Sequence, residues 1–444
     1  MKTFRLAAIA PLVLLLPLVL LIAPAAIAQE RLSLDDAVAR ARSRHPSVEA
    51  GAIAEREAAW EISAARAGFL PRVDLVESWQ RSNMPVFAFS SLLSQRRFSA
   101  SDFDVARLNH PDPLDNFRSA VSVEQVVFDP VLRPSIRAAE LGRDAAVLRR
   151  KQIEQDLAAA AVEAYGRVLL LDALGRAAQA AVTAADQDVR RARDRQEVGT
   201  ATQADVLSLE VHAAAMRERE IQTGAEGKVA KARLNDLIGA PLDAVFVLDL
   251  APAAAGPPEP LATLEAQALD ARPDVRLTHV GADSAAVAVS RARAAFLPQV
   301  AFRGAWEWNG GSFDTRAPGW LMGAEVRLNV FRGFADRARL EQARLARDRQ
   351  DADRMRVENA ARLEVRAALA RLEAADARRT VAQAIVSQAR ESQRITRDRY
   401  EQGLADVTTL LQAAQAVLDA DAQEIAARVD LLIYRAALDR ALGR

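Results

Sequence analysis

The stretch from Ala335 to Gln402 reads ADRARLEQARLARDRQDADRMRVENAARLEVRAALARLEAADARRTVAQAIVSQARESQRITRDRYEQ, which is 68 residues without a glycine or a proline. Helices in globular proteins usually have only a few turns, so this pattern predicts a helix of exceptional length. At about 1.5 Å per residue it would measure roughly 100 Å, more than a compact domain of this chain length can enclose. We therefore expect an elongated protein.

Small apolar residues recur along this stretch at three- and four-residue spacing. They are Val357, Ala361, Val365, Ala368, Leu372, Ala375, Ala382, Val386 and Ala389. Such a stripe is typical of a coiled-coil-like seam. Because alanine is small, the seam lets neighbouring helix backbones approach closely.

The composition of the 444-residue chain excludes several kinds of chemistry. There is no cysteine, so disulfides, thiolate metal sites and cysteine nucleophiles are excluded. The 59 basic and 59 acidic side chains balance, which gives no reason to expect a nucleic-acid partner. His45, His110, His212 and His279 are far apart and have no metal-ligand spacing. The sequence also lacks a phosphate-binding loop and a nucleophile motif, so we expect no enzyme, no metal and no cofactor.

The N-terminus has the pattern of an export signal. Lys2 and Arg5 precede an apolar run, and Ala26-Ile27-Ala28 forms a small-residue cleavage site. We predict that residues 1–28 are a signal peptide, the alternative being an uncleaved membrane anchor. No later segment offers about 18 consecutive apolar residues, so the mature chain would enter a membrane only as strands.

Sequence motifs recur, which indicates two tandem repeats. Pro46 and Pro273 lie in similar surroundings 227 positions apart, and so do the Phe-Leu-Pro motifs ending at Pro71 and Pro298. Gly199 and Gly403 end similar segments, but 204 positions apart. The smaller offset places one large insertion in the first repeat, and the region from Ser82 to Asp115, rich in turn residues, is that insertion.

Each repeat is expected to contain a helix, a strand, a loop, a strand, a very long helix and a shorter helix. We predict a first repeat over 29–250, a linker over 251–260 and a second repeat over 261–444. The expected strands are 72–80, 119–128, 299–308 and 321–331. The first repeat's helices are expected over 32–67, bent at His45-Pro46, and over 135–198 and 202–237, with the shorter helices stacked end to end beside the long one.

The predicted strands suit a membrane. About ten residues with one apolar face match an oblique bilayer crossing. Four strands are too few to close a barrel, so several chains would have to combine their strands. Four tryptophans near strand ends suit the membrane interfaces, although they would also suit the core of a soluble sheet; they are Trp79, Trp306, Trp308 and Trp320.

An ordered set of motifs carries a family resemblance. Leu-Ser-Leu-Asp-Asp-Ala-Val begins at Leu32, Phe-Leu-Pro precedes the first strand of each repeat, and Val198-Gly199-Thr200 is followed by Asp205-Val206-Leu207. Over nearly the whole mature chain, this set resembles the TolC family of outer-membrane efflux proteins.

The resemblance implies a mainly α fold with β: a long antiparallel α-helical coiled-coil barrel joined to a transmembrane β-barrel. A homotrimer would supply four strands per chain and twelve in all. It implies an exit duct in the outer membrane of a Gram-negative bacterium, with a periplasmic helical extension. The duct would conduct substrates passively from a periplasmic adaptor and an inner-membrane transporter. Type I protein secretion and a non-membrane periplasmic coiled-coil protein are the alternatives, and the substrate stays open.

The resemblance also implies functional residues at the helix turns of the periplasmic tip. The expected adaptor contacts are Gly199, Val206, Leu207, Gly403, Leu410 and Leu411. The expected gate residues are Tyr400, Arg195, Arg399, Asp205 and Asp406. The chain departs from the family at two acidic positions after the second turn, where it carries Thr409 and Gln412.

Overall fold

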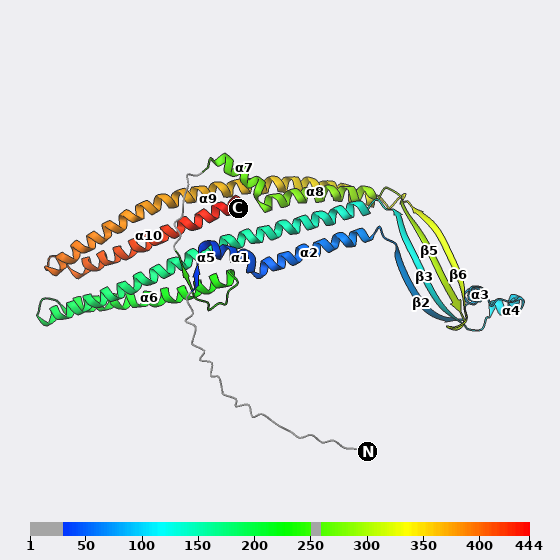
Figure 1. The fold of residues 1–444 in the computed structure, drawn as a ribbon, viewed down its shortest axis with the longest axis horizontal. Helices are drawn as coiled ribbons and strands as arrows, with labels where there is room; N and C mark the ends of the chain where they lie inside the picture. The colour runs from blue at the N-terminus through cyan, green and yellow to red at the C-terminus, as the bar shows by residue number, and fades with distance from the viewer. Residues whose placement is uncertain (1–29, 250–258) are drawn as a thin grey trace, which may run out of the picture.

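The chain forms a long layer of helices with a β-sheet at one end (Figure 1). The computed structural model describes residues 30–249 and 259–444. The predicted signal peptide 1–28 and most of the predicted linker 251–260 therefore lie outside the described residues. The elongated shape that the glycine-free stretch predicted is confirmed.

Both repeats contain the predicted order of elements. The first repeat consists of β1 (Glu30–Leu32), α1 (Leu34–Arg44), α2 (Pro46–Ala67), β2 (Arg72–Ser82), α3 (Pro85–Ser94), a 3-10 turn (Ala100–Phe103), α4 (Val105–Asn109), β3 (Leu114–Phe128), α5 (Leu132–Glu197), α6 (Gln203–Leu237) and β4 (Phe246–Leu248). The second consists of α7 (Leu261–Ala271), α8 (Pro273–Ala294), β5 (Gln299–Gly310), β6 (Arg316–Arg327), α9 (Ala335–Glu401) and α10 (Val407–Ala441).

The long helices α5 and α9 have 66 and 67 residues. Pro134 is compatible with α5 because it lies in the first turn, where a backbone N–H has no helical partner. The two shorter helices of each repeat lie one after the other beside the long helix, as predicted (Figure 1). At this joint in the first repeat the chain is so tight that a Cβ on Gly239 would meet the Arg44 carbonyl oxygen at 3.1 Å.

The helices form one curved layer with a definite order. α9 packs on α8 and α10, these pack on α5, and α5 packs on α2 and α6 (Figure 1). Small and branched apolar residues fill the contacts, and the predicted α9 seam is buried at Ala361, Val365, Ala368, Leu372, Ala375 and Ala382. α2 and α6 thus form one edge of the layer and α9 forms the other.

A short parallel sheet at mid-length was not predicted. β1 pairs with β4, and the fully buried Tyr165 of α5 links their ends. Its hydroxyl lies 2.9 Å from the Leu32 carbonyl oxygen and 2.8 Å from that of Asp249. Burial raises the pKa of this phenol. Three-residue strands carry too little periodicity to be found in a sequence.

A buried arginine fastens the equivalent region of the second repeat. Arg272, just before α8, has a side chain only 8% exposed. Its guanidinium donates to the Asp274 carboxylate at 2.7 and 3.0 Å, to Glu364 of α9 at 2.6 Å and to the Ala441 carbonyl of α10 at 3.3 Å. These bonds raise the pKa of Arg272 against the opposing effect of burial, so the side chain stays charged.

The four longer strands form one antiparallel sheet in the order β2-β3-β5-β6. β2 and β5 cover their predicted ranges and extend two residues further. β3 begins at Leu114 rather than 119, because Leu114 pairs with Ser82 and the ladder continues from there. Asp and Asn at the start of β3 obscured this strand, since both are uncommon in strands.

The last strand was predicted too far along the chain. β6 spans Arg316–Arg327, not 321–331, because a short turn pairs Arg316 with Gly310. Pro318 lies near the start of β6, two residues after Arg316, where the loss of one backbone donor disturbs the ladder little. After Arg327 the chain turns into α9, where the Asn329 side chain donates to Asp336 at 2.5 Å.

The predicted insertion is a folded segment at the far end of the sheet. β2 and β3 are joined by residues 83–113, which contain α3, the 3-10 turn and α4, whereas β5 and β6 are joined by residues 311–315. Phe89, Phe98 and Phe103 pack edge to face, with ring centroids 5.0 Å apart in each pair. The segment is therefore held by its own aromatic core, as the sequence pattern indicated.

Candidate functional site

The sheet and the helical layer each have two edges that no other described element of the chain covers. β2 and β6 each have one side without a strand partner among the described residues. Each edge strand is connected to an edge helix, because β2 follows α2 and β6 precedes α9 (Figure 1). Exposed apolar residues occur along these helices: Ile53 and Trp60 on α2, Val211 and Ile221 on α6, and Leu345, Met355 and Leu363 on α9.

One face of the sheet is mainly apolar and open. Its charged side chains pair with one another, Glu77 with Arg316 at 2.9 Å and Arg81 with Asp115 at 3.6 Å. The strand register aligns Leu75, Val121, Trp306 and Trp320 across all four strands on this face. Leu75 is 74% exposed and Trp320 is 68% exposed. A row of side chains that would form the core of a soluble sheet is thus left uncovered, and an uncovered apolar patch marks an interaction surface.

The four predicted interface tryptophans share this apolar face, towards the hairpin end of the sheet. Trp79, Trp306 and Trp320 are exposed and Trp308 is half-buried. The Trp79 indole N–H donates to the Asp115 carboxylate at 3.1 Å. Amphipathic rings with one polar contact suit a boundary between lipid and water.

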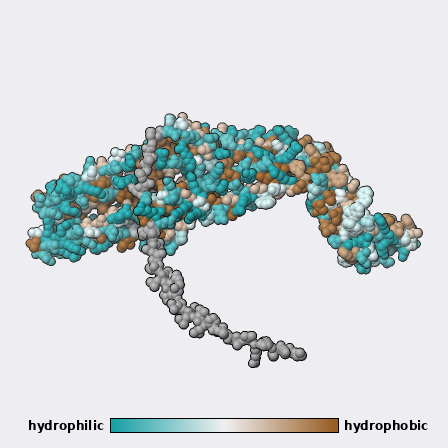
Figure 2. All heavy atoms as spheres, in the orientation of Figure 1, coloured by the Kyte–Doolittle hydropathy of each residue, from teal (hydrophilic) through white to brown (hydrophobic). Residues whose placement is uncertain are grey.

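The other end of the apolar face has exposed phenylalanine and leucine. They lie at the junctions of strands and helices: Phe69, Leu70, Phe128, Phe296, Leu297, Phe331 and Phe334. Figure 2 shows hydrophobic atoms gathered there, while the helical body is mostly hydrophilic. The apolar band is therefore bounded by aromatic residues at both ends.

The opposite face of the sheet is polar and its charges are paired. Arg118 of β3 forms two bonds with Glu307 of β5, one of them at 3.0 Å. Arg303 lies 2.5 Å from Glu325 and 3.4 Å from Glu124. Alternation of apolar and paired polar faces allows the sheet to separate lipid from water.

The two long helices end in equivalent turns at the other extreme of the molecule. Gly199 and Gly403 have φ of 77° and 74°, the left-handed conformation in which glycine is favoured. In each turn a backbone N–H beyond the glycine bonds back to the helix, Thr200 to the Arg195 carbonyl and Leu404 to the Arg399 carbonyl, both at 2.8 Å. These bonds close each helix tightly.

Two predicted gate carboxylates serve as helix caps. Asp205 accepts from the backbone N–H of Thr202 at 3.0 Å, and Asp406 accepts from that of Thr409 at 2.8 Å. The two repeats thus use the same Asp and Thr pair in opposite order. Bonds from Thr409 lower the pKa of Asp406. Within one chain, both carboxylates stabilise the start of a shorter helix.

Two other predicted gate residues meet across the helix pairs. The Arg195 guanidinium of α5 donates to the Tyr400 carbonyl at 3.3 Å and to the Glu401 carbonyl at 2.6 Å. It also lies 5.2 Å from the centre of the Tyr400 ring. The cation thus binds carbonyls in the last turn of α9, where that of Tyr400 also accepts from the Gly403 N–H. Arg399 contributes its backbone carbonyl to the turn.

An ion pair, not predicted from the sequence, joins the same helices one turn earlier on α9 and two turns earlier on α5. Arg397 of α9 lies 3.8 Å from Asp188 of α5. His212 of α6 is half-buried nearby, and burial lowers its pKa although Asp188 opposes the shift. His45 instead caps α2 by accepting from the Ser47 N–H at 3.2 Å, and His110 ends α4.

The predicted adaptor residues differ in accessibility. Val206 is 3% exposed and Leu410 is 2% exposed, so both belong to the core of the tip. Leu411 is half-buried against the same core. Leu207 is 50% exposed and is available to a partner, as are the exposed turn glycines Gly199 and Gly403. Val198 and Leu404, beside those glycines, are exposed as well.

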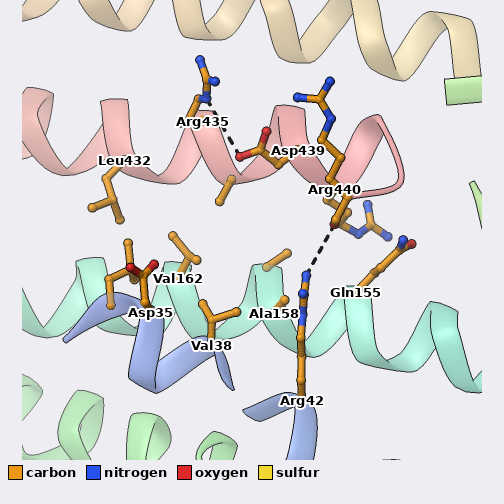
Figure 3. Close-up of a pocket in the computed structure, with 14 residues that line it drawn as sticks. Asp35, Val38, Arg42, Gln155, Ala158, Val162, Leu432, Arg435, Asp439 and Arg440 are labelled. Atoms are coloured by element: carbon orange, nitrogen blue, oxygen red, sulfur yellow. Dashed lines mark hydrogen bonds and ion pairs between the residues drawn. The ribbon is translucent and has the colours of Figure 1, made fainter. Parts of the chain in front are cut away.

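The structure offers no reactive constellation in the part of the chain that it describes. No cluster of three or more potential metal ligands occurs in residues 30–249 and 259–444. A cavity of about 430 Å³ lies between α1, α5 and α10 (Figure 3). Its floor is apolar, with Val38, Ala158 and Val162, while at its rim Arg435 lies 3.9 Å from Asp439. No helix of the described residues is long and apolar enough to span a membrane.

Solved structures of outer-membrane proteins share the fold. The CmeC outer membrane channel of Campylobacter jejuni matches with a TM-score of 0.80 at 17% identity, covering 92% of this chain and 85% of that one. VceC of Vibrio cholerae matches with a TM-score of 0.76 at 20% identity, covering 92% and 96%. The open MtrE channel of Neisseria gonorrhoeae matches with a TM-score of 0.69 at 19% identity, covering 92% and 88%.

A search among curated protein sequences finds no match. The family model for outer membrane efflux protein matches residues 37–240 and 264–444, one segment in each repeat. This match confirms the predicted family, its outer-membrane location and the prediction that the protein is a channel and no enzyme. It also excludes the periplasmic structural protein considered from the sequence. The chain belongs to the outer membrane efflux protein family.

Proposed function

We propose that three copies of this chain form one exit duct of a tripartite efflux pump. The observation that carries the proposal is the pair of matching open edges. Unpaired strand edges in a membrane leave backbone groups without partners, which costs several kcal/mol per group by order of magnitude. Joining β6 and α9 of one copy to β2, α2 and α6 of the next removes both edges at once. Three copies of four strands make a closed barrel of twelve.

In this assembly the two faces of the sheet have different neighbours. The apolar face with Trp79, Trp306 and Trp320 contacts lipid, and the face with the Arg118–Glu307 pair lines the pore. The layer of helices continues the pore as a tunnel through the periplasm. Paired charges on the pore side leave little net field, so the wall itself selects weakly among solutes.

The tip is the proposed gate and the proposed adaptor contact. The Arg195 bonds to the end of α9 hold the two helix pairs of one chain together, which favours a narrow opening. Leu207, Val198 and Leu404 surround the turn glycines and give a periplasmic adaptor an apolar surface. The adaptor and the inner-membrane transporter provide the driving force, and the duct performs no chemistry.

Purified protein in a planar bilayer tests this function. We expect discrete channels from particles with three times the chain mass, as measured in detergent by light scattering. Monomers without channel activity would overturn the proposal. The adaptor contact is tested separately, since Leu207→Asp should abolish binding of the adaptor while leaving the channels unchanged.

A further inference from the structure

The segment between β2 and β3 has no role in the duct described so far. We name α3, the 3-10 turn and α4 the outer-end unit, residues 85–109. It lies beyond the hairpin end of the sheet, away from the helices (Figure 1). A long connection packed on its own aromatic side chains is typical of a functional loop.

The outer-end unit is anchored by a buried glutamine. Gln95, at the end of α3, is 3% exposed. Its amide donates to the Asp115 carbonyl at 2.8 Å and to the Asn116 side-chain oxygen at 3.1 Å. Asn116 in turn donates to the Asn309 side chain at 3.0 Å. A buried chain of satisfied amides fixes position strongly, since each unpaired amide would be costly.

Two arginines strengthen the anchor. Arg96 adopts a left-handed conformation with φ of 56° and donates to the Pro318 carbonyl of β6 at 3.0 Å. Arg97 donates to the Gln95 side-chain oxygen at 3.2 Å. The unit is thus fastened to β3, and through Asn309 and Pro318 to β5 and β6, so it cannot swing freely from its two chain ends.

The anchor lies on the polar side of the sheet. In the strand register Asn116 is two residues from Arg118, and Asn309 is two residues from Glu307, so all four share a face. This face lines the pore in the proposed duct. The outer-end units of three copies therefore lie on the pore side at the outer mouth of one barrel.

We infer that the three outer-end units form a size-limiting cap at the exit of the channel. The inference rests on the proposed trimeric duct. Barrels of about eight strands are filled by side chains and those of about sixteen hold an open aqueous channel, so twelve strands enclose a moderate lumen. Three folded units anchored inside its rim occupy much of that opening.

The absence of cysteine allows a direct test in intact cells. Ser122→Cys places one thiol on the polar face, below the cap, and Val121→Cys places one on the apolar face. External maleimides are applied in two sizes, a small membrane-impermeant reagent and one carrying a long polyethylene glycol chain. The cap is removed by replacing residues 83–113 with Asn-Gly, which is feasible because Ser82 and Leu114 are paired directly.

With the cap present, we expect the small reagent to label Cys at position 122 and the large one to be excluded. Removing the cap should speed labelling by the large reagent roughly tenfold or more, because access depends on the narrowest part of the pore. Gln95→Ala should give a smaller increase, and the exposed control Ser90→Ala should give none. Equal rates with and without the cap would overturn the inference.

The same experiment separates this inference from the proposed duct. If the small reagent labels positions 121 and 122 alike, then the two faces do not differ in access and the duct itself is refuted. If it labels only position 122, the duct stands and the large reagent decides about the cap.

Discussion

Arg195→Ala should open the periplasmic tip. The change removes two charged bonds to the α9 carbonyls, at 3.3 and 2.6 Å, and the contact with the Tyr400 ring. Hydrogen bonds to charged groups contribute about 1.5–3 kcal/mol, and a cation over an aromatic ring adds about 0.5–1 kcal/mol at the low end of its range. Because the tip is partly solvated, we reduce the total to about 1–2 kcal/mol.

That free energy changes the ratio of closed to open tips by a factor of about 5 to 30 per chain. Single-channel recording in planar bilayers would measure it as a larger fraction of time in high-conductance states. Arg193→Ala is the matched control, since Arg193 lies two residues away but binds Glu210 of α6, within one helix pair. Wild-type gating in Arg195→Ala, or equal opening in Arg193→Ala, would refute the assignment of Arg195.

Three further predictions concern stability. Arg272→Ala should destabilise the protein by about 2–4 kcal/mol, because it leaves the half-buried Asp274 without its partner; thermal unfolding would measure this, and the exposed Arg366→Ala should not change it. Gly403→Ala should destabilise the tip by about 1 kcal/mol through its φ of 74°. Gly142→Ala, in open space near the sheet end of α5, should instead stabilise that helix by roughly 0.5–1 kcal/mol; a lower melting temperature in Gly142→Ala would contradict this. Burial lowers the pKa of His212, so the neutral imidazole stabilises the folded protein fully above its ordinary pKa of about 6.5. This stabilisation is lost as the pH falls through the lower pKa of the folded protein. The melting temperature of His212→Gln should therefore fall less between neutral and acidic pH than that of the wild type, and an equal fall would refute this role.

The large elements of the fold were predictable because their signals are long. A glycine-free stretch of 68 residues leaves little alternative to one helix. Repeat offsets located the insertion in the first repeat, and alternation in the strands identified the face that carries Trp306. Errors occurred where the local signal was weak, as in the three-residue strands β1 and β4.

The tip was only partly predictable. Thr and Asp three residues apart, in either order, form a recognisable capping pattern. The sequence alone therefore indicated a capping role for Asp205 and Asp406, beside the proposed role in a gate. The contact of Arg195 with Tyr400 joins residues about 200 positions apart, and only tertiary packing brings them together. Equally, no local pattern distinguished the buried Leu410 from the exposed Leu207, because accessibility depends on how the helix pairs meet.

Cross-linking between the two open edges tests the trimeric wall most directly. One cysteine is placed along β2, between Val73 and Trp79, and a second along β6, between Leu321 and Val326, in the otherwise cysteine-free chain. The control pair, Ser122→Cys with Ala305→Cys, joins neighbouring strands within one chain. If three copies close the wall, some edge pairs will give a covalent trimer on a denaturing gel and the control will give monomers. Monomers from every edge pair, or an open ladder beyond three chains, would contradict the account.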